Sequence, residues 1–326
     1  MKKNLAFVLA VCLAFASAGC GSASSGSASQ PASQPASQQS SAASEAAGAA
    51  KPTTDPSGAA VEIPDQIDTI VSLAPSITET LVALGCGEQL VAVDTNSQGL
   101  EGVAEDLPAF DLMQPDMEQL SALQPDVLFV SNMTLYDNSS PYEQLIEQGV
   151  CVLCVPSSDS IADIQDDLAF VAAAVGKEQE GEAMVEQMQA EIDRIAAIGE
   201  TITDKKTVYF EISATPDMYS FGGGVFLDEM IEIIGAENIL GEETGWLRVE
   251  PETIMAADPD VILTNVNYIE DPVGEIMGRS GWDALSAVKN QQVYYVDNMA
   301  SSLPNQNVVK ALDQMAKAVY PEYYEG

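Results

Sequence analysis

Two stretches of the sequence repeat each other without gaps, Glu118-Gln-Leu-Ser-Ala-Leu-Gln-Pro-Asp-Val127 and Glu252-Thr-Ile-Met-Ala-Ala-Asp-Pro-Asp-Val261. Five of the ten aligned positions are identical. Each stretch has the pattern of a short helix that leads through Pro-Asp-Val into an apolar strand. Upstream of each copy, a helical pattern ends in a glycine, Gly85 in the first half and Gly235 in the second. The shared order predicts two halves with the same local fold.

Short β-branched and apolar runs alternate with helical patterns around both repeats. The predicted strands are 70–74, 90–93, 127–131, 150–155, 207–212, 261–264 and 293–296. Such alternation is typical of parallel sheets covered by helices on both faces. The sequence therefore predicts an α/β protein of two Rossmann-like lobes.

Two helices can be placed from their ends and faces. Ser76 followed three residues later by Glu79 fits a capping box, which predicts that a helix begins at the serine. Residues 178–200 contain no proline and carry an apolar stripe of Met184, Met188, Ile192, Ile195 and Ile198. Because this segment lies at the boundary between the halves, we expect one long helix that joins the lobes. A surface helix of one lobe is the alternative.

The first 52 residues have a different composition from the rest of the chain. Lys2 and Lys3 precede an apolar run that is too short to span a bilayer, and small residues follow it, which predicts a signal peptide over 1–19. The next residue, Cys20, resembles the lipidated cysteine of a bacterial lipobox, although Ser17 stands where that motif has leucine. Residues 21–50 are almost entirely Ser, Ala, Gly, Gln and Pro, so we expect a flexible tether over 20–52. An ordinary secretory signal is the alternative.

The charge of the chain excludes several classes of function. It has 12 Lys+Arg, 50 Asp+Glu and no His, for a formal net charge of −38. A nucleic-acid partner is not expected, because phosphate binding depends on basic residues. The lack of histidine excludes Ser-His-Asp triads and metal sites built on imidazole. A Gly-x-Ser-x-Gly elbow and a Walker loop are also missing, so we do not expect an enzyme.

Three cysteines follow the predicted tether, Cys86, Cys151 and Cys154. The last two have redox or zinc spacing, but they lie in a predicted strand, where positions three apart face opposite sides. Three thiols without histidine do not complete a zinc site. Buried thiols are therefore the favoured interpretation, and a disulfide between Cys86 and one of the pair is the alternative.

Several segments together resemble the iron-siderophore/cobalamin class of substrate-binding proteins of ABC importers. They are residues 54–64, 70–85, 117–127, 281–290 and 292–296, and the resemblance runs in order through nearly all of 53–326. It implies lobes at 53–177 and 201–326, one rigid helix at 178–200, and a ligand cleft between the lobes. Thr69 is a departure, because the family usually has arginine before the first strand.

The resemblance also implies partners and the residues that contact them. One glutamate on each lobe of these proteins docks on the permease dimer, which works with an ATPase, and Glu118 and Glu252 match those positions. Two carboxylates on related lobes can grip a two-fold partner at two points and fix its register. The alternative is that each glutamate merely suits the positive end of its helix, an effect of about 0.3–1 kcal/mol.

Ligands of open α/β sheets lie beyond the carboxyl ends of the strands. The loops predicted there supply Ser76, Met113, Tyr136, Tyr219, Trp246, Arg248 and Tyr268 as cleft residues. Further candidates are Pro75, Asn96, Phe110, Asn132, Met133, Met218, Asn267, Asn298 and Met299.

The expected ligand follows from charge. Only Arg248 and Arg279 are expected to reach the cleft as cations, whereas a ferric tris-catecholate would need several. We therefore expect a neutral or cationic metal chelate, a corrinoid such as cobalamin or a ferric hydroxamate. Haem is the weaker alternative, since its iron would need a tyrosine ligand.

The sequence thus predicts a monomeric, extracytoplasmic solute-binding lipoprotein that is attached to the cell membrane by lipid alone. It needs no cofactor of its own, and its ligand is an iron or cobalt chelate. A surface sensor or adhesin, or an enzyme, on the same two-lobed fold is the alternative, because fold does not fix function.

Overall fold

Two parallel sheets organise the residues that the structure describes, which are 51–134 and 141–324 of a computed structural model. The first sheet has the strand order β3-β2-β1-β4-β5. Its strands are β1 (Ile70–Ser72), β2 (Leu90–Asp94), β3 (Ala109–Phe110), β4 (Val127–Val130) and β5 (Cys151–Cys154). Its helices are α1 (Pro75–Ala83), α2 (Met117–Leu123), α3 (Glu143–Glu147) and α4 (Ile161–Ala174).

The second sheet has the order β11-β10-β6-β8, and its pairs are also parallel. Its strands are β6 (Thr207–Glu211), β8 (Glu237–Asn238), β10 (Val261–Thr264) and β11 (Val293–Tyr295). A separate antiparallel ribbon pairs β7 (Tyr219–Phe221) with β9 (Trp246–Arg248). The helices are α6 (Phe226–Ile233), α7 (Pro251–Ala257), α8 (Pro272–Gly278), α9 (Ser286–Lys289), α10 (Asn298–Ser302), α11 (Val308–Val319) and α12 (Pro321–Tyr324). All seven predicted strands are therefore present, in two α/β lobes.

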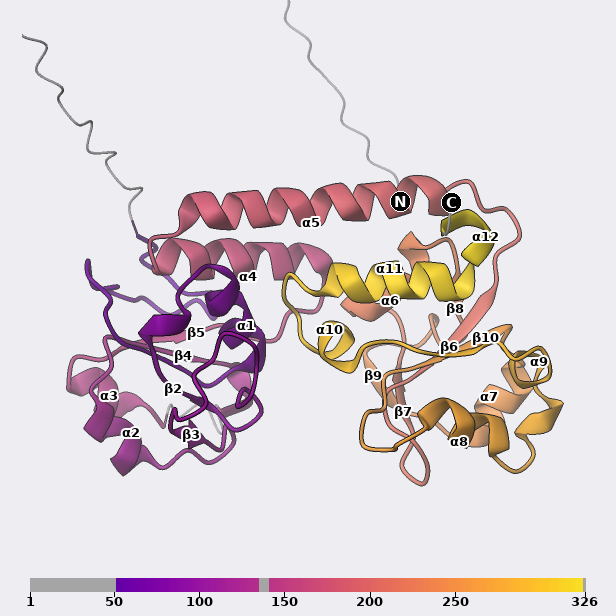
Figure 1. The fold of residues 1–326 in the computed structure, drawn as a ribbon, viewed down its shortest axis with the longest axis horizontal. Coiled ribbons are helices and arrows are strands. Elements are labelled where there is room, and N and C mark those ends of the chain that lie inside the picture. Colours follow the sequence, from indigo (N-terminus) through magenta and orange to yellow (C-terminus); the bar gives the residue numbers. More distant parts are fainter. Residues whose placement is uncertain (1–50, 135–140, 325–326) are drawn as a thin grey trace, which may run out of the picture. The chain divides into compact units, whose positions relative to one another are not determined.

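One helix, α5 (Glu178–Gly199), connects the lobes and runs alongside α4 and α11 (Figure 1). A Cβ at Gly181 would lie 2.3 Å from that of Ala172 in α4, and a Cβ at Gly199 would lie 2.2 Å from the carbonyl oxygen of Ile233. The two glycines let the helix backbone touch a different lobe near each end. The predicted apolar stripe follows the same division: Met184 packs against the core of the first lobe, and Met188, Ile192 and Ile195 are buried in the core of the second.

The sequence repeat has a structural counterpart at the start of β4 and β10. The Asp126 carboxylate accepts hydrogen bonds from the Thr69 amide and hydroxyl, both at 2.9 Å. The Asp260 carboxylate accepts the same pair from Thr207, also at 2.9 Å. Each aspartate therefore ties its strand to the residue that leads into the neighbouring strand. Thr69, the departure from the family pattern, occupies the position that Thr207 has in the other half.

The predicted capping box at Ser76 is wrong. Helix α1 begins at Pro75, its N-cap residue is Ala74, and no side chain caps it. Proline is pre-organised for the first helical position and lacks the amide that a cap would satisfy, so the helix begins one residue earlier. Glu79 is thereby free for a different contact. Its carboxylate accepts hydrogen bonds from the side-chain amides of Asn305, at 2.6 Å, and Asn307, at 2.9 Å.

Replacing Glu79 with alanine is expected to lower the free energy of unfolding by about 1–2 kcal/mol, because two amides lose a shared ionised acceptor. Glu79→Gln keeps one carbonyl acceptor and should lose less. Glu88→Ala removes an exposed carboxylate nearby and serves as the control. Urea unfolding of the four proteins measures the difference, and a Glu79→Ala protein as stable as the control would contradict this role.

The three described cysteines are buried and free. Cys151 and Cys154 belong to different core clusters, one on each side of the first sheet, as the strand spacing predicts. Burial raises the pKa of both thiols to about 11, so they stay protonated at neutral pH. The structure confirms buried thiols rather than a disulfide from Cys86.

Candidate functional site

Three exposed aromatic residues lie on the loops and ribbon that follow the carboxyl ends of β6 and β10. Tyr268 is 64% exposed, Trp246 52% and Tyr219 42%. We call these three residues the aromatic surface. Tyrosine and tryptophan, which combine an apolar ring with a polar tip, are enriched where a protein meets a ligand or partner. All three were predicted as cleft residues.

The rings of the aromatic surface are held in place by the residues behind them. The Tyr268 hydroxyl accepts the Ala214 amide at 2.8 Å and lies 3.2 Å from the Ser213 hydroxyl. The Trp246 ring packs edge-on against Phe221 and Phe226, with centroid distances of 6.0 and 6.5 Å. Rings that are already ordered lose little conformational entropy on binding, so they suit a flat or bulky ligand.

Neutral amides lie beside the end of β10. The Asn267 side-chain amide donates to the Asn298 side-chain carbonyl at 3.0 Å, and the Asn298 amide donates to the Asn265 backbone carbonyl at 2.7 Å. Asn267 and Asn298, both predicted as candidates, are therefore brought together. Tyr295 joins them, because its hydroxyl accepts the Asn298 backbone amide at 3.3 Å. Amides offer donors and acceptors without net charge.

The expectation that Arg279 reaches the cleft as a cation is wrong. Its side chain is 8% exposed and forms a bidentate ion pair with Glu211, at 2.8 and 3.1 Å, and a second ion pair with Glu275. The guanidinium also lies 4.2 Å from the centre of the Trp282 ring. Arg279 is a structural residue of the second lobe.

The same cluster changes the ionisation of its members. Burial raises the pKa of Glu211, and this effect exceeds the opposing effect of its hydrogen bonds with Arg279. Burial alone would lower the pKa of Arg279, but its bonds with Glu211 and Glu275 raise it above the usual value. The buried carboxylate of Glu211 and the partly exposed carboxylate of Glu275 therefore share one guanidinium.

Arg248 lies beside the aromatic surface, since it pairs with Tyr219 in the β7–β9 ladder. Its guanidinium forms an ion pair with Asp217 at 3.0 Å. Asp217 is not among the predicted residues, because a loop aspartate carries no signal before its partner is known. Tyr295 is not among them either, although its place at the carboxyl end of a strand could have indicated it.

In the first lobe, the predicted residues are more scattered. Ser76 lines a small cavity together with Thr80, Asp167 and Asn305. Met113 follows β3 and is 37% exposed. Tyr136 and Cys20 lie outside the described residues.

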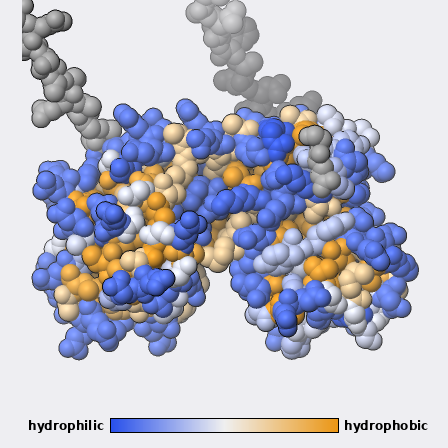
Figure 2. Space-filling view, viewed as in Figure 1, coloured by the Kyte–Doolittle hydropathy of each residue, from blue (hydrophilic) through white to orange (hydrophobic). Residues whose placement is uncertain are grey.

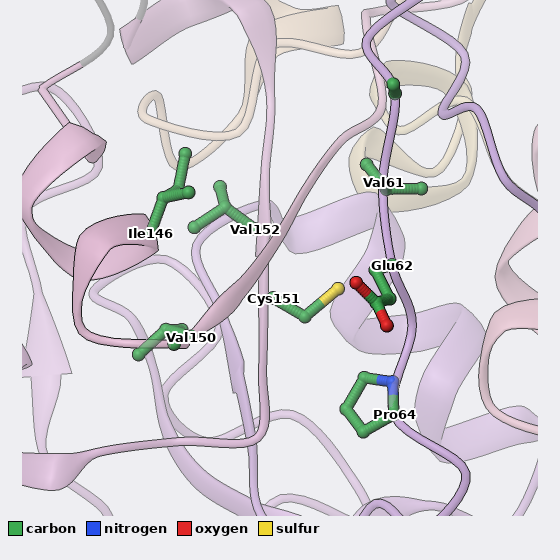
Figure 3. Close-up of a pocket in the computed structure, with 9 residues that line it drawn as sticks. Val61, Glu62, Pro64, Ile146, Val150, Cys151 and Val152 are labelled. Atoms are coloured by element: carbon green, nitrogen blue, oxygen red, sulfur yellow. The ribbon is translucent and has the colours of Figure 1, made fainter.

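A groove of about 440 Å³ lies along the outer edge of β5 (Figure 3). The segment 60–64 forms one wall, and Cys151 and Val152 lie on the other. Because Cys151 is the first residue of β5, this groove is at the amino end of the strand. It is therefore not part of the predicted cleft, which lies at the carboxyl ends.

Glu118 and Glu252 occupy the first turns of α2 and α7, the equivalent helices of the two lobes. Both are exposed, and neither carboxylate has a hydrogen-bond or ion-pair partner within residues 51–134 and 141–324. The two carboxylates are thus available to a partner outside the chain. On the molecule as a whole, Figure 2 shows hydrophilic residues over much of the visible face, with apolar patches between them.

Comparisons with known proteins agree with this architecture. Residues 70–300 match the model of a family described as periplasmic binding protein. An uncharacterised ABC transporter substrate-binding lipoprotein of Bacillus subtilis, YvrC, is 29% identical over 83% of this chain and 86% of its own. The molybdate-binding protein MolA of Haemophilus influenzae is 26% identical over 83% and 85%. A cobalamin-binding protein of Halobacterium salinarum is 23% identical over 82% and 74%.

A solved structure from Staphylococcus epidermidis, titled a possible iron-binding (periplasmic solute-binding) protein, is 27% identical. It superposes with a TM-score of 0.68 over 78% of this chain and 100% of its own. None of the helices in the described ranges is both long and apolar enough to span a membrane. The chain belongs to the periplasmic binding protein family, in the class of ABC-importer substrate-binding proteins that includes vitamin B12-binding and iron-binding members.

Proposed function

We propose that the protein is the extracytoplasmic solute-binding component of an ABC importer that captures a metal chelate and delivers it to a permease. Membership of the family supports the importer role. The observation that carries the choice of ligand is the aromatic surface, whose neighbouring arginine is already paired with Asp217. A surface of ordered rings and paired charge favours a bulky ligand without strong negative charge.

The ligand is a corrinoid such as cobalamin or a ferric hydroxamate. Both present large, partly apolar surfaces and need neutral donors and acceptors, which the amides of Asn267 and Asn298 offer. Molybdate, the ligand in the name of one relative, is a small oxyanion that would need several free donors or cations. Haem is the alternative ligand, with a tyrosine such as Tyr219 as the iron ligand.

The cleft contacts come from both lobes. Tyr219, Trp246, Arg248 and Tyr268 line the second lobe, and Ser76, Met113 and Tyr136 line the first. Glu118 and Glu252 dock on the two halves of the permease, and the protein acts as a monomer. The chain divides into a signal peptide at 1–19, a lipidated tether at 20–52, lobes at 53–177 and 201–326, and the connecting helix at 178–200.

A thermal-shift screen against cyanocobalamin, a ferric tris-hydroxamate and haemin tests this proposal. A ligand present at 100 times its Kd stabilises the folded protein by about 2.7 kcal/mol, which gives a clear rise in Tm. Trp246→Ala should remove most of that rise, because it truncates the largest ring of the surface. A rise with none of the three chelates would contradict the proposed ligand class.

The protein is held at the outer face of the cytoplasmic membrane by lipid on Cys20. The small residues before Cys20 and the polar segment after it support this proposal. Cys20→Ala is expected to leave an uncleaved precursor or to release the mature protein. Any processed Cys20→Ala protein should therefore leave the detergent phase, with Cys86→Ala as the matched control. Unchanged partition of the processed Cys20→Ala protein would contradict lipidation.

A further inference from the structure

The ion pair between Arg248 and Asp217 lies beside the aromatic surface. Arg248 and Tyr219 are directly opposite in the β7–β9 ladder, so their side chains leave the same face of the ribbon. Trp246 is two residues before Arg248 on the same strand and shares that face. Asp217 is two residues before Tyr219, in the connection whose Ser213 and Ala214 contact the Tyr268 hydroxyl.

This ion pair has little value for folding. The side chains of Arg248 and Asp217 are 57% and 65% exposed. Exposed pairs of this kind are worth little, because water and salt screen them and two side chains must be ordered. The ion pair between Arg279 and Glu211 is different, since both side chains are almost completely removed from water. Asp217 is therefore expected to act on the ligand that binds at this surface, and not on the stability of the fold.

Arg248 is the group on this surface best suited to bind an anion. The sequence has three arginines; Arg194 is paired with Glu191 and Asp313 on α5 and α11, and Arg279 is buried. A guanidinium binds carboxylates and other oxyanions through a fork of parallel hydrogen bonds. The Asp217 carboxylate lies 3.0 Å from Arg248 Nη2 in an ion pair and adds a negative charge at the same place.

We propose that Asp217 is the charge-selecting residue of the ligand site: by occupying Arg248, it rejects anionic chelates and leaves neutral or cationic chelates unaffected. The inference rests on the proposed function and assigns its selectivity to one residue. Specificity requires repulsion of the wrong ligand as well as attraction of the right one. The acidic chain as a whole also repels anions, but salt screens that field beyond about 8 Å. For a ligand in contact with Arg248, the charge of the Asp217 carboxylate therefore affects binding more than the net charge of the chain does.

The test compares the parent with Asp217→Asn, Asp283→Asn and the double variant Asp217→Asn/Arg248→Gln. Asp283 is an exposed aspartate of the second lobe without a side-chain partner in the described ranges, so its substitution removes the same charge elsewhere. The probes are cyanocobalamin, which is neutral, and ferric enterobactin, a multiply anionic tris-catecholate. Intrinsic tryptophan fluorescence gives the Kd of each of the four proteins for each chelate at physiological salt.

Asp217→Asn is expected to tighten the binding of ferric enterobactin by about tenfold, because Arg248 becomes available for a charge-assisted contact. Its Kd for cyanocobalamin should change by less than about twofold. Asp283→Asn should change neither value by more than that, and the added Arg248→Gln should abolish the gain. A gain that increases at low salt would fit a contact between charges.

Two results would overturn the assignment of Asp217 while leaving the proposed function intact. The first is a parent that binds cyanocobalamin and an Asp217→Asn protein with no better affinity for ferric enterobactin. The second is an equal gain in Asp283→Asn, which would make net charge the cause. A parent that binds no metal chelate at all would contradict the proposed function itself, and this inference with it.

Discussion

Uptake of the chelate by the complete transporter is expected to fall by more than about tenfold when Glu118 and Glu252 are both replaced with alanine. On the proposed docking role, each lobe then loses its ionic contact with the permease, and truncating one partner of such a pair typically costs about 2–5 kcal/mol of binding. Each single variant should be intermediate. Raising the salt concentration should weaken docking of the parent more than that of the double variant.

The same double variant should keep its fold and its ligand. Exposed carboxylates in a first helical turn contribute at most about 1 kcal/mol each to folding. Its Kd for the chelate should stay within a few-fold of the parent value. The matched control is Glu143→Ala/Glu322→Ala, which removes two exposed first-turn glutamates, one from each lobe. A double variant that loses ligand affinity but still docks would assign the two glutamates to the cleft instead.

Arg279→Met is expected to lower the free energy of unfolding by about 3–5 kcal/mol, the largest stability effect anticipated for this protein. The substitution leaves Glu211 buried without its cation, and the stacking on Trp282 is lost as well. Arg248→Met removes the exposed ion pair and should cost less than about 1 kcal/mol. Adding Glu211→Gln to Arg279→Met should restore part of the stability, since no buried charge then lacks a partner.

The deficit of Arg279→Met should grow with pH. Burial already raises the pKa of Glu211 in the folded parent, and loss of the guanidinium raises it further. Between the unfolded and the folded pKa, the folded state binds the proton and the unfolded state does not. Stability therefore falls as the pH rises through that window. Urea unfolding at mildly acidic and mildly alkaline pH measures this trend, and a deficit independent of pH would contradict the proposed ionisation of Glu211.

The features of the fold that the sequence predicted correctly are those that depend on a local pattern of residues. Strands such as 127–131 and 261–264 were found because apolar β-branched runs end at turn residues. The helix at 178–200 was found because its apolar stripe has one clear period. The repeat around Asp126 and Asp260 was visible because the same hydrogen bonds to Thr69 and Thr207 require the same residue types in each half.

The predictions that were wrong or missing concern features that depend on contacts between distant segments of the chain. Glu79 fits a capping box locally, but Pro75 and the partners Asn305 and Asn307 determine its actual role. The sequence predicts Arg279 as a cation of the cleft, because nothing near it in the sequence indicates its ion pair with the distant Glu211. The two-residue strands β3 and β8 are too short to show a period, so only their pairing reveals them.

Isothermal titration of the purified protein with the chelate selected by the thermal-shift screen decides whether the protein is a solute-binding protein. We expect saturable binding at one site per chain with a negative heat-capacity change, because apolar surface on both partners is buried. The chelate recovered afterwards should be chemically unchanged. Heats that do not saturate, or a chelate recovered in altered form, would contradict a solute-binding protein and favour an adhesin or an enzyme on the same fold.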